Sequence, residues 1–353
     1  MQGFSIIICC HNGASRLSPT LRHLRAQEAG NRQWEVLLVD NASTDGSSEL
    51  ALSLWQNGPA PLRVVREPKL GLNNARERGL AASRYEFLGF VDDDNWVEAD
   101  WVSTAYDVLS ADSQLGAVGS ICEPVYETPA PKWFQHFQKS FAILTDSDVQ
   151  QIAQPPDFVN GAGLCIRRVA WERLIENGFR FQLTDRVGKR LSGGGDIELT
   201  LALRLAGWKL HIEQRLRLQH FMPSQRLQWP YLRKLMRNYG ASDVLLDAYS
   251  QYSVSLQPGF RCWLSDRWWY QFGKSLGRME SRPSAVIAAL LSSNGEGRNE
   301  IIEIEKQFGR ALGLLKFSKR YSALRCEVRD AAWRKRPDHY DTSLEAAPKG
   351  EVS

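Results

Sequence analysis

Short apolar runs alternate with amphipathic segments along the first third of the chain. Four runs are rich in β-branched and aromatic residues and have the length of buried strands. The first amphipathic segment, SPTLRHLRAQ, offers Ser18 as an N-cap, followed by Pro19 at the first helical position. The predicted strands are 4–10, 34–40, 62–67 and 85–91, and the predicted helices between them are 18–27, 44–56 and 71–83.

This order of elements predicts an α/β fold with parallel βαβ units and helices on both faces of one sheet. In such sheets, ligands bind beyond the carboxyl ends of the strands. Polar residues stand at three of these ends, at 11–13, 40–45 and 92–95. For 41–44, ordinary turn chemistry is an equally good explanation, because Asn, Ser and Asp favour turns and caps.

The cluster at 92–94 is harder to explain as a turn. Asp92, Asp93 and Asp94 follow the apolar run FLGFV, and three adjacent carboxylates at the end of a buried strand repel one another unless a cation offsets the charge. Oxygen ligands suit a hard divalent cation. We therefore expect Mn²⁺ or Mg²⁺ at this place.

Four stretches in order resemble successive motifs of family-2 glycosyltransferases of the GT-A fold. They are SIIICCHNGASRLSPTLRHL, EVLLVDNASTDGS, GLNNARERGL and FLGFVDDDNWVEADWV, and the resemblance covers about residues 4–223. It implies a Rossmann-like, mostly parallel sheet and transfer of a sugar from a nucleotide-diphosphate donor, most often a UDP-sugar, usually with inversion. The leaving diphosphate requires charge neutralisation by a metal, so the resemblance also implies Mn²⁺ or Mg²⁺ as the cofactor.

The resemblance implies a role for each residue that matches a motif. The acidic triplet matches the D-x-D motif of the family, with Asp94 as the metal ligand, Asp92 facing the ribose or base, and Asp93 as a further nucleotide contact. Asp40 matches the position that hydrogen-bonds the base, and Asn12 lies in the loop that cups it.

Two cationic residues and one histidine extend this list. Arg76 matches a family arginine near the nucleotide, although an ion pair with Glu77 or a nearby acid would also explain it. His220 ends a strand-like run at the place where several GT-A enzymes add a histidine to the metal, and a packed or capping histidine is the alternative. Arg226 is a candidate contact to the diphosphate.

The stretch LSGGGDIELTLALRLAGWKLHI places Asp196 between three glycines and an apolar helical pattern. Asp196 could simply cap that helix. In the family this place reads G-E-D, and its Asp is the general base that deprotonates the acceptor hydroxyl. Gly195 departs from the pattern, Asp196 matches it, and Glu198 is the reserve candidate.

The acceptor is expected between these motifs. The segment 158–174 fits the family's acceptor side, where Gly161 and Gly163 allow close backbone approach. Trp133 lies in the variable segment and could stack on a sugar, although ordinary packing explains a single Trp equally well.

The C-terminal part differs in character, because residues 230–336 carry 19 Lys and Arg against 10 Asp and Glu, a net charge of +9. Basic and aromatic helices suit an anionic membrane surface, and a helical bundle with a solvated basic face explains them equally well. The predicted division is a GT-A domain at 1–225, with a nucleotide half at 1–121 and an acceptor half at 122–225. A helical region at 226–336 and a disordered tail at 337–353 follow.

The remaining observations limit the functional classes. The longest apolar run, AVIAALL, is far shorter than the ~20 residues that span a bilayer. The N-terminus lacks signal-peptide features and the six cysteines form no metal or disulfide pattern, which predicts a cytoplasmic protein. A peripheral position on the inner membrane face is compatible with the same observations. No nucleic-acid-binding module is recognisable.

The leading hypothesis is a metal-dependent inverting glycosyltransferase acting on a saccharide or lipid-linked acceptor in bacterial surface polysaccharide synthesis. The alternative is a sugar-nucleotide-binding protein without activity, and Gly195 is its only support. A nucleotidyltransferase is a weaker rival, since CCHNGAS lacks the Gly-rich, basic phosphate loop of that class.

Overall fold

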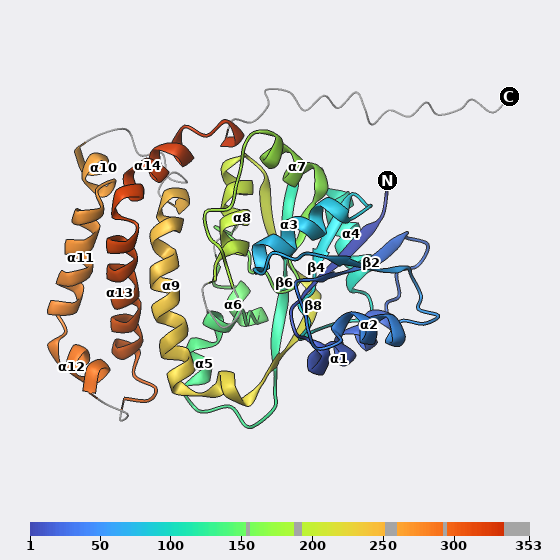
Figure 1. The fold of residues 1–353 in the computed structure, drawn as a ribbon, viewed down its shortest axis with the longest axis horizontal. Coiled ribbons are helices and arrows are strands. Elements are labelled where there is room, and N and C mark those ends of the chain that lie inside the picture. Colours follow the sequence, from blue (N-terminus) through green and yellow to red (C-terminus); the bar gives the residue numbers. More distant parts are fainter. Residues whose placement is uncertain (153–155, 187–192, 251–259, 292–294, 335–353) are drawn as a thin grey trace.

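The computed structural model describes residues 1–152, 156–186, 193–250, 260–291 and 295–334. Within these residues, a mixed eight-stranded sheet with flanking helices forms one part of the molecule, and a stack of helices forms the other (Figure 1). The predicted disordered tail, 337–353, lies outside the described residues. The predicted α/β fold with a helical C-terminal region is confirmed.

The nucleotide half of the sheet is parallel. Its central strand β1 (Phe4–Cys10) pairs with β2 (Trp34–Asp40) on one side and β4 (Phe87–Phe90) on the other, and β3 (Leu62–Arg66) lies beyond β2. Ile6 and Ile8 enter the core on one face of the sheet and Ile7 enters the core on the other. Because β1, β2 and β4 are buried on both faces, these three strands are largely apolar, which is why the sequence pattern located them, whereas the edge strand β3 is only half-buried.

The other half of the sheet is mixed and brings distant residues to the acidic triplet. β7 (Cys165–Arg167) runs antiparallel to β4 and to β6 (Leu115–Tyr126), and β8 (Lys209–Met222) runs parallel to β6. The short β5 (Asn95–Val97) follows the triplet directly and pairs with β8, so that Asn95 lies opposite His220. This register places the end of β8 beside the triplet.

Six helices cover the two faces of the sheet. One face carries α1 (Ala14–Arg25), α2 (Ser47–Leu54) and α4 (Trp101–Ala111), and the other carries α3 (Leu72–Ala82), α7 (Arg168–Glu176) and α8 (Gly195–Leu205). The segment between β6 and β7 contains α5 (Phe134–Phe137), the 3₁₀ helix η1 (Gln138–Phe141) and α6 (Asp146–Val149), and η2 (Ser224–Leu227) follows β8.

The predicted start of the first helix is wrong. α1 begins at Ala14, so Ser18 is not its N-cap and Pro19 lies inside the helix. The first backbone N–H groups are satisfied from another loop: Gly13 N–H donates to the Ser47 hydroxyl at 3.0 Å, and Ala14 N–H donates to the Asp45 carboxylate at 2.9 Å. These long-range partners move the helix start upstream of the local capping signal.

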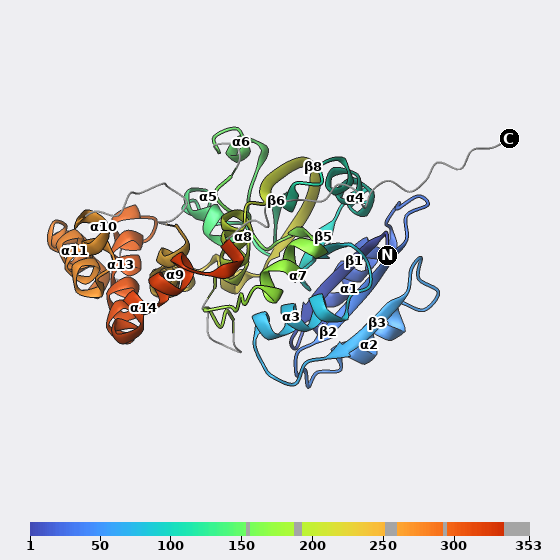
Figure 2. The ribbon, with the colours of Figure 1, turned by 90° about the horizontal axis from the view of Figure 1, so that it is seen from above.

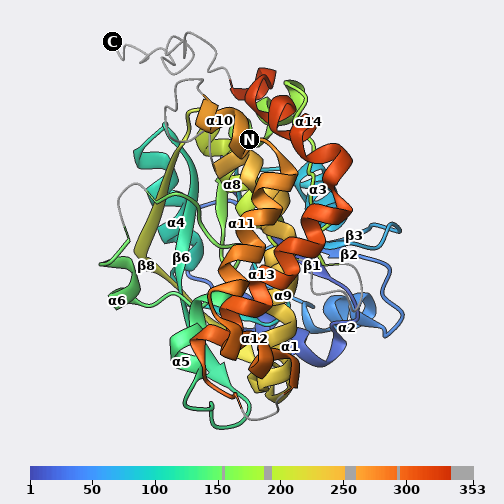
Figure 3. The same cartoon turned by 90° about the vertical axis from the view of Figure 1, so that its left-hand side faces the viewer.

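The C-terminal helices stand beside the sheet domain in layers (Figures 2 and 3). α9 (Trp229–Ser250) lies next to the sheet domain, and α13 (Asn299–Lys316) packs along the outer side of α9. A Cβ on Gly240 would collide with the Lys306 carbonyl group and one on Gly309 with the Arg237 carbonyl group, so glycines permit this close contact. The helices are α9 (Trp229–Ser250), α10 (Phe260–Ser265), α11 (Trp268–Glu280), α12 (Pro283–Leu291), α13 (Asn299–Lys316) and α14 (Ser318–Arg329), followed by η4 (Ala332–Arg334).

Part of the basic charge of the C-terminal helices is neutralised by ion pairs with acidic residues of the same helices. Arg233 and Arg237 both form ion pairs with the buried Glu305, and Arg310 pairs with Asp247. No helix among the described residues combines the length and the apolar character that crossing a membrane requires.

Candidate active site

A pocket of about 300 Å³ opens at the carboxyl ends of β1 and β4. Eight predicted site residues line it, whereas five others do not. The lining includes Arg76, Asp92, Asp93, Asp94, Gly161, Asp196, His220 and Arg226. The predicted residues outside the lining are Asn12, Asp40, Trp133, Gly163 and Glu198. The pocket therefore unites residues from both halves of the sheet domain.

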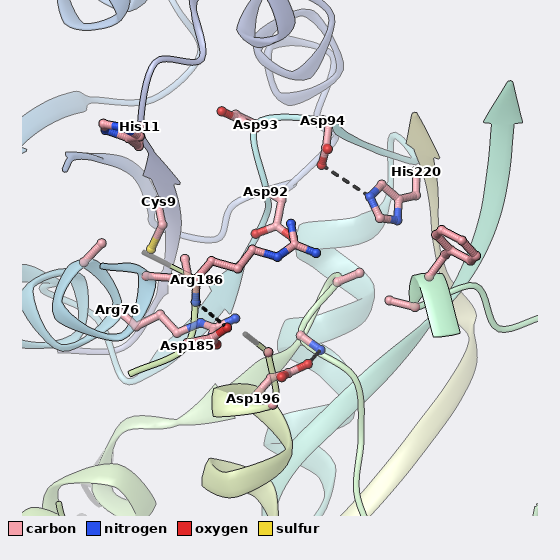
Figure 4. Close-up of a pocket in the computed structure, with 18 of the residues that line it drawn as sticks. Cys9, His11, Arg76, Asp92, Asp93, Asp94, Asp185, Arg186, Asp196 and His220 are labelled. Atoms are coloured by element: carbon pink, nitrogen blue, oxygen red, sulfur yellow. Dashed lines mark hydrogen bonds and ion pairs between the residues drawn. The ribbon is translucent and has the colours of Figure 1, made fainter. Parts of the chain in front are cut away.

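The three adjacent aspartates have three different environments (Figure 4). Asp93 points away from the other two, and its carboxylate accepts two hydrogen bonds from the Arg16 guanidinium, at 3.1 and 2.7 Å. Burial and then the charge of Asp94 raise the pKa of Asp92 to about 6. The strand end tolerates the triplet because its carboxylates face different partners.

Asp94 is the most strongly ionised member of the triplet. One carboxylate oxygen lies 3.0 Å from Arg226 and the other lies 3.5 Å from Nε2 of His220. Burial raises the pKa of Asp94, but His220, Arg226 and Arg186 outweigh burial and hold the pKa well below its usual range. Arg226, at the end of η2, is thus an ion-pair partner of the triplet.

The residues around Asp94 fit a divalent cation. Nε2 of His220 lies 3.0 Å from the Arg226 guanidinium, and a neutral imidazole is the form of histidine that binds metals. Its Nδ1 is buried without a hydrogen-bond partner among the described residues. A carboxylate and an imidazole nitrogen supply two ligands, and no group of three His, Cys, Asp or Glu that could hold a metal occurs in the described part of the chain. Further ligands would have to come from a bound molecule or water.

The loops after β1 and β2 are hydrogen-bonded to each other, and the side chains of Asn12 and Asp40 do not line the pocket. The side-chain oxygen of Asn12 accepts a hydrogen bond from Thr44 N–H at 2.9 Å, and the backbone N–H of Asn12 donates to the Ser43 hydroxyl at 3.1 Å. The Asp40 carboxylate accepts from Ser43 N–H at 2.9 Å and from the Ser48 hydroxyl at 3.0 Å. These bonds outweigh the effect of burial and lower the pKa of Asp40. The turn explanation thus accounts for the described contacts, while the nucleotide roles of Asn12 and Asp40 stay predictions.

Arg76 has an acidic partner, but not the neighbouring Glu77. Its guanidinium lies 2.5 Å from the buried carboxylate of Asp185 and 3.0 Å from the Asn73 side chain. Asp185 also accepts the backbone N–H of Gly195 at 3.1 Å, so it links α3 to the start of α8. A Cβ on Gly195 would lie 2.6 Å from the Asp185 carboxylate. The departure from the family pattern at position 195 therefore has a packing explanation.

Asp196 does not cap its own helix. The N-cap of α8 is Gly194, with a φ of 109°, and Asp196 lies in the first turn without a capping hydrogen bond. One of its oxygens accepts the backbone N–H of Gly161 at 2.6 Å (Figure 4). No described residue hydrogen-bonds its other oxygen, and the side chain lines the pocket. The capping interpretation of Asp196 is therefore wrong.

Two predicted site residues, Glu198 and Trp133, lie outside the pocket lining. Glu198 is completely buried, and its carboxylate accepts from the Gln182 and Leu183 backbone and from the Tyr249 hydroxyl. Trp133 is also buried; its indole N–H donates to Glu296 and its ring packs against Trp229. Neither side chain reaches the pocket. Gly163, which directly follows the lining residue Ala162, has a left-handed backbone conformation with a φ of 68°.

Sequence reasoning missed several residues of the pocket. Among them, Asp185 and Arg186 lie on the segment before α8, and Tyr231 and Tyr239 lie on α9. The Arg186 guanidinium faces Asp92 (Figure 4), and it makes no hydrogen bond with the described part of the chain. No motif marks these residues; only the helical spacing of the two tyrosines could have suggested a shared face.

Comparisons with known proteins show which sequences and folds this chain resembles. Residues 5–174 match the profile described as Glycosyl transferase family 2. The succinoglycan biosynthesis protein ExoM of Rhizobium meliloti is 25% identical over 228 residues, covering 64% of this chain and 69% of ExoM. EpsH of Bacillus subtilis is 29% identical over 97 residues, which cover 28% of this chain, and the match spans only 27% of the length of EpsH.

Among solved structures, the mannosyltransferase PcManGT from Pyrobaculum calidifontis, in complex with GDP-Man and Mn²⁺, shares the fold. Its TM-score is 0.56 at 18% identity, and the match covers 94% of this chain and 85% of that one. The chain therefore shares the GT-A fold of this mannosyltransferase, and its residues 5–174 match glycosyl transferase family 2. The predicted family is confirmed.

Proposed function

We propose that the chain is a metal-dependent inverting glycosyltransferase that uses a nucleotide-diphosphate sugar. The observation that carries this proposal is the single pocket that joins Asp92 and Asp94 on one side to Asp196 on the other. The acceptor is a saccharide or lipid-linked saccharide of a surface polysaccharide. The name of ExoM, which refers to succinoglycan biosynthesis, supports this acceptor class.

The donor side is built on Asp94. Asp94 and His220 would hold Mn²⁺ or Mg²⁺, which when bound neutralises charge on the departing diphosphate. Arg186 and Arg226 bring two further positive charges to the same side. Asp92 faces the ribose or base, and the interlocked loops of Asn12 and Asp40 shape the end of the pocket that receives the base of a UDP-sugar.

The acceptor side is built on Asp196. Gly161 N–H fixes one carboxylate oxygen, which leaves the other oxygen to remove the proton of the acceptor hydroxyl. The oxygen of that hydroxyl attacks the anomeric carbon as the bond to the diphosphate breaks on the opposite face, which inverts the configuration. The ion pair of Asp185 with Arg76 helps to position Asp196, because Asp185 also accepts the backbone N–H of the neighbouring Gly195.

The alternative function, a sugar-nucleotide-binding protein without activity, rests on Gly195 alone. Because the Asp185 carboxylate and the Asn73 side chain occupy the space beside Gly195, packing is a sufficient reason for the missing side chain. The free oxygen of Asp196 favours the enzyme.

We also propose peripheral association with the inner face of the cell membrane. Trp269 and Leu276, which are 50% and 44% exposed, lie on α11 together with the exposed Lys274 and Arg278. Exposed aromatic and aliphatic side chains beside cations suit an anionic lipid interface. The internal ion pairs of Arg233, Arg237 and Arg310 limit the charge available for it.

A donor screen tests the main proposal. Release of nucleotide would be measured with UDP-, GDP- and dTDP-sugars, with and without Mn²⁺. We expect turnover with one nucleotide class, and none in the presence of a chelator. A folded protein that binds a nucleotide but releases none from any sugar donor would favour the alternative.

A further inference from the structure

The C-terminal helix α9 contributes a wall to the pocket, although it lies outside the family-matched residues 5–174. Tyr231, Leu235 and Tyr239 all line the pocket and are spaced four residues apart. Side chains at this spacing lie on one face of a helix. The same helix packs against α13 on another face, so α9 separates the pocket from the outer helices.

Both tyrosine rings are held in place. The Tyr239 hydroxyl donates to the Ser140 carbonyl oxygen at 3.0 Å, and its ring approaches Gly193, where a Cβ would lie 3.0 Å away. The Tyr231 ring stacks on Phe141, with 6.2 Å between ring centroids and 18° between planes. A fixed aromatic surface loses little side-chain entropy when a ligand lies on it.

This aromatic wall lies beside the proposed base. Gly193, which contacts Tyr239, precedes Asp196 by three residues, and all of these residues line one pocket. The residues that line the donor side come from other elements, chiefly the ends of β1 and β4. An acceptor that presents a hydroxyl to Asp196 from the side away from Asp94 must therefore lie against α9.

We propose that Tyr231 and Tyr239 form the acceptor subsite and that its occupant is a saccharide ring. Tyrosine combines an apolar ring face with a polar edge, which matches the apolar C–H face and hydroxyl edge of a pyranose. The neighbouring polar groups, the Asp196 carboxylate and the Arg186 guanidinium, suit a hydroxylated ring and not a lipid chain. This proposal rests on the proposed glycosyltransferase function and adds the place and chemistry of its acceptor site.

The test is equilibrium binding of p-nitrophenyl glycosides of the common hexoses, followed by saturation-transfer NMR with UDP and Mn²⁺ present. We expect at least one glycoside to bind the wild-type protein. Tyr231→Ala and Tyr239→Ala should each weaken that binding by about threefold to tenfold, the usual size of a ring-stacking contribution. The loss of glycoside affinity should exceed any change in UDP affinity.

Two further variants separate stacking from damage to the fold. Tyr239→Phe keeps the ring and should bind the glycoside more tightly than Tyr239→Ala. Tyr270→Ala, on α11 and outside the pocket lining, should leave glycoside and UDP binding unchanged. Equal glycoside affinity in wild-type and both alanine variants would overturn the subsite, as would a wild-type protein that binds UDP but none of the glycosides. A wild-type protein that does not bind UDP would instead count against the proposed function.

Discussion

The guanidinium of Arg226 lies 3.0 Å from the carboxylate of Asp94 and donates a hydrogen bond to His220 at the same distance. Arg226 thus contacts both residues that we propose as metal ligands. A cation in this position balances the charge of Asp94, and it also competes with a metal ion for the same atoms. Arg226, which the sequence suggested as a contact to the diphosphate, therefore lies in one cluster with the proposed metal ligands Asp94 and His220.

Replacing Arg226 with Gln should strengthen Mn²⁺ binding in the absence of nucleotide by at least severalfold, because a competing positive charge is removed from Asp94. Isothermal titration with Mn²⁺ would measure the change. Arg32→Gln, which breaks an ion pair with Asp107 far from the pocket, is the matched control. Equal Mn²⁺ affinity in Arg226→Gln and wild type would show that Arg226 does not compete with the metal.

Replacing Asp94 with Asn should abolish the Mn²⁺ dependence of UDP binding, because a neutral amide is a poorer ligand for a divalent cation. The fold should survive, since the side chain keeps its shape. UDP affinity would be compared with and without Mn²⁺, with Asp107→Asn as a surface control. A folded Asp94→Asn protein with normal metal-dependent UDP affinity would refute the role of Asp94.

Replacing Asp196 with Asn should lower turnover by ~10²–10⁴, the usual contribution of a positioned general base. The amide oxygen can still accept Gly161 N–H, so the melting temperature and the donor affinity should change little. Steady-state kinetics with the donor found in the screen would measure the effect, with Asp146→Asn as an exposed control. Turnover close to that of wild type would rule out Asp196 as the base.

The stability of the protein should depend on pH through Glu198. Burial raises the pKa of Glu198 to about 7 in the folded protein, against an ordinary value of 4.5. The folded state then binds more protons than the unfolded state between these values, so its stability falls as the pH rises from about 4.5 to about 7. The loss is on the order of 3 kcal/mol for a shift of this size.

Urea unfolding of the wild type and Glu198→Gln between pH 5 and pH 8 would test this dependence. The Gln variant should show a flatter profile, because it cannot titrate. Glu176→Gln, an exposed change on α7, should retain the wild-type profile. An identical pH profile in Glu198→Gln and wild type would assign the dependence to other groups.

Liposomes containing anionic lipid should sediment the protein at low salt and release it at high salt, because salt screens the attraction between charges. Trp269→Ala combined with Leu276→Ala should weaken sedimentation, since both side chains are exposed on α11. Leu52→Ala, an equally exposed apolar change on α2, is the control. Absence of binding at every ionic strength would leave the helices with a packing role alone.

The sequence located the parallel strands well because their burial leaves a direct pattern. The bounds of β1 and β2 agree with the predicted 4–10 and 34–40. The start of α1 was missed because its capping groups, Asp45 and Ser47, come from a different loop. Local propensity contains no information about such partners.

The contrast between local pattern and long-range packing also explains which residues of the candidate site the sequence could predict. Asp94 follows β4, Asp196 follows a glycine loop, and His220 lies near the end of β8; sheet topology alone brings strand ends together. Arg186, Tyr231 and Tyr239 reach the pocket only through the packing of α9 and the loop before α8, which no local pattern encodes. Trp133 shows the reverse case, since an aromatic residue in the expected segment is used for packing against Trp229.

The glycine contacts between α9 and α13 have a consequence for gene design and for shuffling between relatives. Because Gly240 and Gly309 allow the two helices to touch through their backbones, α9 depends on α13 for its position. A stop codon after residue 225 would keep the whole family-matched region but remove the α9 wall of the pocket. A chimera that changes acceptor choice should therefore exchange residues 229–334 as one unit, so that Arg226 and the other donor-side residues stay with the part before it.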